Sequence, residues 1–80
     1  MKIQLIKGSF DAKEATDIIT QMIHVKIKFH ESKISNLSNE EDIKFREGRI
    51  KQLQKELYEA VKYFKETKNT IDLSSDIEII

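Results

Sequence analysis

The chain has 80 residues, 39% hydrophobic and 35% charged, with two glycines and no proline, tryptophan or cysteine. This length allows one domain, residues 1–80, and without proline no interior position is forced out of a helix. The missing cysteines exclude a disulfide framework, a thiolate nucleophile and a cysteine-ligated zinc site, and 14 basic against 14 acidic residues argue against a dedicated polyanion-binding protein.

The N-terminal segment predicts a short β-strand over residues 2–7. Alternation would place Ile3 and Leu5 on one side of the strand and the other side chains opposite: Lys2, Gln4 and Ile6. The segment lacks the apolar run of a signal peptide, and no stretch of the chain approaches the roughly 20 apolar residues of a membrane span. We therefore expect a cytoplasmic protein that does not enter membranes.

The next segment predicts a helix over residues 12–35. Asp11 is placed to cap it, with Glu14 as its capping-box partner and Ser9 as the competing cap. At about 100° per residue the apolar positions form two overlapping stripes. The first contains Ala15, Ile18, Met22, Val25 and Phe29, and the second contains Ile19, Ile23, Ile27 and Ile34. One neighbouring helix covers only one stripe, so the other needs a further partner.

Residues 36–39 predict a turn, and a second helix follows over residues 40–67. Ser38 is the expected N-cap, with Glu41 as its reciprocal partner. The core positions of this helix keep a heptad spacing: Ile43, Arg46, Ile50, Leu53, Leu57, Ala60 and Phe64. Because the turn is short, the sequence predicts an antiparallel two-helix hairpin with coiled-coil-like packing.

The C-terminal segment loses the helical period after Lys68. Residues 76–79 alternate as a short strand would, and Ser74 with Ser75 predicts a turn before it. The expected order is therefore β-α-α-β in a mainly α protein. Both termini of such a hairpin return to the same end, so the two strands can pair antiparallel, within one chain or between chains.

The pattern also predicts self-association, because a lone two-helix hairpin buries too little apolar area to offset its conformational entropy. Without disulfides or a metal, a partner subunit is the remaining source of stability. We expect a homodimer that forms a four-helix bundle through the second stripe. Another protein is the alternative occupant of that stripe, which contains Ile19, Ile23, Ile27 and Ile34.

Polar residues at apolar positions predict a polar layer near the turn, formed by Lys26, His30, Arg46 and Glu47. Antiparallel register would bring His30 towards Arg46 and Glu47. We expect this layer to fix the register of the helices or the oligomeric state. The alternative is a small anion or carboxylate site built from Lys26, His30 and Arg46.

A stripe of lysines follows one flank of the second helix, within about 40° of arc: Lys44, Lys51, Lys55 and Lys62. We expect a solvated flank beside the helix seam, supported by Glu47–Lys51 and Lys62–Glu66 ion pairs. The alternative is a row of phosphate contacts in a nucleic-acid-associated accessory protein. The neutral net charge favours the first interpretation.

No pattern predicts catalysis or a cofactor. His24 and His30 lie about 240° apart around their helix and so cannot share a metal ion, and no nucleophile–base pair or glycine-rich phosphate loop is present. We expect a non-enzymatic protein–protein interaction module with an adaptor, regulatory or assembly role. In composition and heptads the chain resembles short bacterial helical-hairpin proteins, a resemblance that carries no functional residues.

Overall fold

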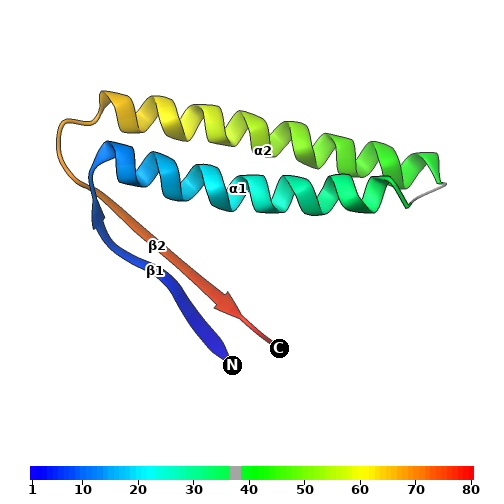
Figure 1. The fold of residues 1–80 in the computed structure, drawn as a ribbon, viewed down its shortest axis with the longest axis horizontal. Coiled ribbons are helices and arrows are strands. Elements are labelled where there is room, and N and C mark those ends of the chain that lie inside the picture. Colours follow the sequence, from blue (N-terminus) through cyan, green and yellow to red (C-terminus); the bar gives the residue numbers. More distant parts are fainter. Residues whose placement is uncertain (37–38) are drawn as a thin grey trace.

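The computed structural model describes residues 1–36 and 39–80 and has the order β-α-α-β (Figure 1). Its elements are strand β1 (Lys2–Phe10), helix α1 (Ala12–Ile34), helix α2 (Glu40–Glu66) and strand β2 (Ile71–Glu78). The helices lie side by side and antiparallel, and β1 pairs with β2 of the same chain as an antiparallel ribbon. The predicted mainly helical hairpin with short terminal strands is confirmed.

Both helices begin at a side-chain cap. Asp11 Oδ1 accepts a hydrogen bond from the Glu14 amide at 2.8 Å, and Glu14 Oε1 accepts one from the Asp11 amide at 3.0 Å. This is the predicted capping box. Helix α2 is capped by Asn39, whose Oδ1 accepts from the Glu41 amide at 2.8 Å. The predicted cap, Ser38, lies outside the described residues, and the cap of α2 is one position further along the chain.

Strand β2 begins earlier than the predicted strand over residues 76–79. Ser74 and Ser75, which the sequence predicts as a turn, lie inside β2 and pair with Lys7 and Ile6. That prediction is wrong because serine has only a weak intrinsic preference for turn or strand. The backbone hydrogen bonds to β1 decide its conformation. Strand β1 likewise continues past its predicted end.

An irregularity in β1 decides which of its side chains share a face. The register shifts between Gln4 and Ile6, so Leu5 is an additional residue in this strand. Alternation slips by one position there, and Ile6 faces the same side as Ile3. The predicted placement of Ile6 beside Lys2 and Gln4 is therefore wrong. A bulge arises from the pairing of β1 with β2, so the sequence pattern of β1 alone does not reveal it.

The hydrophobic core is small and lies where the ribbon meets both helices. Ala15 of α1, Phe64 of α2 and Ile71 of β2 are buried there. Partly buried apolar side chains surround them: Phe10, Ala12, Ile19, Ala60 and Leu73. Further along the hairpin, Leu53 and His30 are the other buried residues among those described. The core thus holds three elements together at one end of the molecule and leaves the other end to two helices.

Candidate interaction surface and basic cluster

The ribbon is amphipathic, with one apolar and one polar face. Paired residues of an antiparallel ladder share a face. The mainly apolar face therefore carries Ile3, Ile6, Gly8, Phe10, Ile71, Leu73, Ser75 and Ile77, and the polar face carries Lys2, Gln4, Lys7, Ser9, Asp72, Ser74, Asp76 and Glu78. Because Phe10 and Ile71 belong to the core, the apolar face is turned towards the helices. Its outer part, at Ile3 and Ile77, is exposed.

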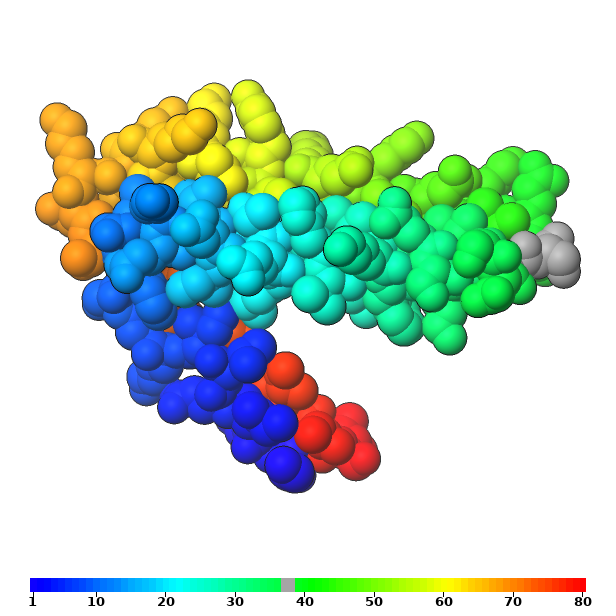
Figure 2. Space-filling view, in the orientation of Figure 1, coloured from blue at the N-terminus to red at the C-terminus, as the bar shows by residue number. Residues whose placement is uncertain are grey.

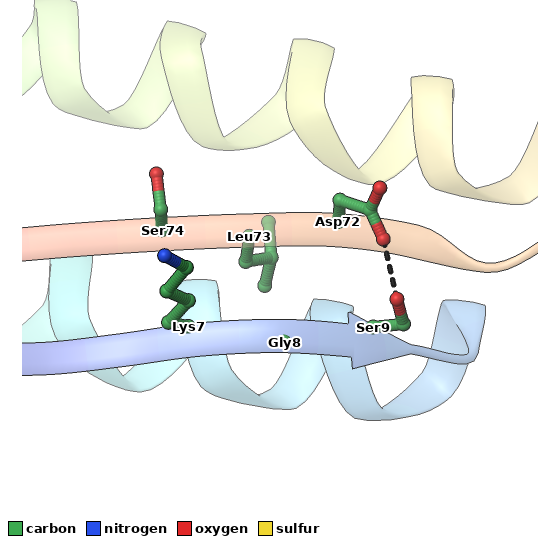
Figure 3. A pocket seen from close by; sticks show the side chains of 6 residues that line it. All are labelled: Lys7, Gly8, Ser9, Asp72, Leu73 and Ser74. Atoms are coloured by element: carbon green, nitrogen blue, oxygen red, sulfur yellow. Dashed lines mark hydrogen bonds between the residues drawn. The ribbon is translucent and has the colours of Figure 1, made fainter.

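Side chains on the polar face of the ribbon contact one another across the two strands. Ser9 Oγ donates to Asp72 Oδ1, and Lys2 Nζ lies 3.6 Å from Asp76 Oδ2. Figure 3 shows Ser9 and Asp72 beside Lys7 and Ser74, around a shallow depression of about 320 Å³. The Ser9 hydroxyl donates to a carboxylate, and no histidine lines this depression to act as its base. The contacts here are therefore those of paired strands and do not form a nucleophilic site.

Helix α1 carries an apolar stripe that is exposed in part. Ala15, buried against Ile71, begins this stripe, and residues at helical spacing continue it towards the turn; we call them the α1 stripe: Ile18, Met22, Val25 and Phe29. Val25 is 71% and Phe29 46% exposed. Figure 2 shows the ribbon diverging from α1 with open space between the two arms. We call this space between α1 and the ribbon the open wedge.

The predicted partner-facing stripe is more covered than the α1 stripe. Ile19, Ile23, Ile27 and Ile34 are all half-buried. Ile27 lines a groove with Leu57 of α2, and Ile34 lines another with Ile50. The predicted stripe is therefore covered in part within one chain, whereas Val25 and Phe29 of the α1 stripe are exposed.

The polar layer is built around His30, which is 6% exposed. Arg46 Nη1 lies 3.0 Å from His30 Nδ1. Because a guanidinium only donates hydrogen bonds, Nδ1 is the acceptor and the imidazole proton lies on Nε2. Nε2 is buried and has no hydrogen-bond partner among the residues that the structure describes. Of the two residues expected near His30, Arg46 is thus its hydrogen-bond partner.

Burial lowers the pKa of His30, and the positive charges of Lys26, Arg46 and Arg49 lower it further. Both causes disfavour the imidazolium, since burial removes its hydration and the cations repel it. The ring is therefore neutral near pH 7, as the hydrogen bond from Arg46 requires.

Cations gather around the Phe29 ring, next to His30. Lys26 Nζ lies 5.0 Å, Lys33 Nζ 5.6 Å and Arg46 Cζ 5.7 Å from the ring centroid. Within the described ranges, no carboxylate lies within 4.0 Å of these cations. We call Lys26, Phe29, His30, Lys33 and Arg46 the basic cluster.

Sequence reasoning placed Lys26, His30 and Arg46 together but missed Phe29 and Lys33. The available signal was their spacing, because Lys26, Phe29 and Lys33 follow one another at i+3 and i+4 on α1. Glu47 lies apart from the cluster and lines the groove beside Ile34.

The predicted lysine stripe is exposed on one flank of α2: Lys44, Lys51, Lys55 and Lys62. Lys44 Nζ lies 3.6 Å from Glu40 Oε1. The predicted Glu47–Lys51 and Lys62–Glu66 ion pairs are not formed within 4.0 Å in the described part of the chain. Near the end of this flank, Lys62 and Tyr58 line a small depression of about 190 Å³.

Comparison with known proteins returned no matching family model, no matching curated protein and no matching solved structure. Over residues 1–36 and 39–80, the structure contains no group of three or more His, Cys, Asp or Glu side chains that could hold a metal ion. None of the described helices has an apolar stretch long enough to cross a membrane.

Proposed function

We propose that this chain is a homodimeric protein–protein interaction module, in which a second copy occupies the open wedge. The module acts by binding, in an adaptor, regulatory or assembly role, and not by catalysis. The observation that carries this proposal is the exposure of apolar side chains on both arms of the molecule, Val25 and Phe29 on α1 and Ile3 and Ile77 on the ribbon.

The exposed area of the chain supports a large interface. One chain exposes 6488 Å², about 1,500 Å² more than the roughly 5,000 Å² typical of a folded monomer of this mass. Its radius of gyration is 15.1 Å, against about 12 Å for a compact domain of this length. If two copies each buried this excess, the interface would total about 3,000 Å², within the range of obligate homodimers.

A second copy fits the wedge because the two surfaces that need covering complement each other. A two-stranded ribbon is at best marginally stable in water by itself. The ribbon here packs against the helices in the core, through Phe10, Ile71 and Leu73. In a two-fold dimer, the α1 stripes would pack together as a four-helix bundle, and each ribbon would lie over the partner's helices. One contact would thus cover both exposed surfaces in both chains.

Sedimentation equilibrium of matched variants tests this proposal. Val25→Asp places a charge in the α1 stripe, and Tyr58→Asp places one at a similarly exposed position, 69%, on the lysine flank of α2. We expect the wild type and Tyr58→Asp to be dimers and Val25→Asp to dissociate at least tenfold more readily, because an unpaired charge is costly at an apolar interface. A folded monomer at millimolar wild-type concentration, or equal dissociation of both variants, would contradict the proposal.

A further inference from the structure

We propose that the basic cluster is a carboxylate-binding site, in which Arg46 binds the anion, Lys26 and Lys33 supply further positive charge, and His30 positions Arg46. The site is formed by α1 and α2 of a single chain, so it does not depend on the proposed dimer.

The orientation of Arg46 is fixed from two sides. His30 Nδ1 accepts a hydrogen bond from Nη1 at 3.0 Å, and the guanidinium lies over the Phe29 ring at 5.7 Å. A guanidinium has several N–H donors in one plane, and these contacts use only part of them. The remaining donors form a fork that matches the two oxygens of a carboxylate. Arg46 is therefore held in place before an anion arrives, which reduces the entropy lost on binding.

The charge of the cluster is unbalanced. Lys26, Lys33 and Arg46 surround one ring, and no carboxylate of the described residues lies within 4.0 Å of any of them. The same structure does pair cations elsewhere, as Lys2 with Asp76 and Lys44 with Glu40 show. A bound anion would relieve the mutual repulsion of the cluster, and the partial burial of Arg46 would strengthen its attraction for the anion.

The imidazole of His30 would respond to an anion beside Arg46 through its pKa. Its Nε2–H is a buried donor without a partner in the part of the chain that the structure describes. Buried donors of native proteins are satisfied in most cases by protein, water or ligand. Nε2 is directed away from Arg46, so an anion bound by Arg46 would not be its acceptor, but the negative charge of the anion would raise the pKa of His30 from its lowered value.

The carboxylate has two possible sources: a small acid in solution, or an Asp or Glu side chain of a second copy seated in the open wedge. Both present the same group to Arg46. Phe29 belongs to the α1 stripe as well as to the cluster, so an acidic residue at the proposed interface can reach the site.

NMR titration of the His30 imidazole tests the proposal. The full chain is titrated in sodium acetate and in sodium chloride at equal ionic strength, with the exposed His24 as internal control. We expect acetate to raise the pKa of His30 saturably and to leave His24 unchanged. Arg46→Gln should weaken acetate binding about tenfold or more, since it removes a charged donor, whereas Arg49→Gln should retain binding.

The same titration at low and high protein concentration distinguishes the two sources. A His30 pKa that rises with protein concentration, in competition with acetate, assigns the carboxylate to a second copy, and a rise with acetate alone assigns it to a small acid. Either result supports the site. Equal His30 pKa values in acetate and chloride at all protein concentrations would overturn it. If Arg46→Gln does not fold, Lys26→Gln and Lys33→Gln take its place, and each should weaken binding.

Discussion

The two ends of the helical hairpin are stabilised in different ways. At the ribbon end, Ala15, Phe64 and Ile71 come from three elements and form an apolar core. At the turn end, only α1 and α2 meet, and the buried contact is the polar pair His30–Arg46 with exposed Val25 and Phe29 nearby. The comparison shows that this chain builds an apolar core from three elements at one end and joins the other end through a polar pair between two helices.

The largest expected effect comes from the ribbon end. Phe64 is 6% exposed, and Phe64→Ala should destabilise the chain by about 3–5 kcal/mol through lost burial and a cavity. Phe45, 68% exposed near the turn, is the matched control, and Phe45→Ala should change stability by less than about 0.5 kcal/mol. Urea unfolding followed by circular dichroism measures both. Similar losses of unfolding free energy in the two variants would contradict the proposed difference in stability between the two ends.

The turn end should respond to pH. In the unfolded chain His30 titrates near its ordinary pKa of 6.5, and in the folded chain burial and three cations lower that pKa. Below pH 6.5 the unfolded chain therefore binds more protons, and stability falls as the pH falls, by at most about 1.4 kcal/mol per pH unit.

Urea unfolding between about pH 7 and pH 5 measures this slope, above the range in which most carboxylates titrate. His30→Leu should flatten it, whereas His24→Gln, at an exposed position, should leave it as in the wild type. A slope unchanged by His30→Leu would show that the polar pair does not control the turn end.

The two helix N-caps lie at opposite ends of the hairpin, so their removal compares the stability of the two ends. Asp11 caps α1 beside the core and Asn39 caps α2 at the turn. Asp11→Ala and Asn39→Ala should each cost about 1 kcal/mol in thermal unfolding. Hydrogen exchange should place the loss from Asn39→Ala in the first turns of α2, since fewer tertiary contacts hold that end. Loss spread evenly over the chain would contradict this.

The lysine flank should contribute least. Lys51→Glu with Lys55→Glu changes two exposed residues outside the core, so we expect stability to change by less than about 0.5 kcal/mol and the oligomeric state to match that of the wild type. Fluorescence anisotropy with single-stranded RNA at low salt checks the alternative function. Binding that weakens steeply with salt and is lost in this variant would favour a nucleic-acid-associated role.

The candidate site was predictable only in part. The predicted antiparallel register brought His30 of one helix towards Arg46 of the other, since a short turn leaves little choice of register. Whether Arg46 or the adjacent Glu47 contacts His30 depends on the rotation of α2 about its axis. The spacing of Phe29 and Lys33 was visible, but only packing shows that the Phe29 ring gathers cations from both helices.

Sequence alone determined the kinds of element and their order. Caps at Asp11, helical periodicity, the absence of proline and a short turn act within a few residues, so they fix two antiparallel helices locally. Tertiary structure decided the extent of β2, the bulge at Leu5 and the choice of the α1 stripe as the exposed face. The physical reason is that strand register, and the choice of the helix face that is buried, depend on the neighbouring element. From the sequence alone, either apolar stripe of α1 could have packed against α2.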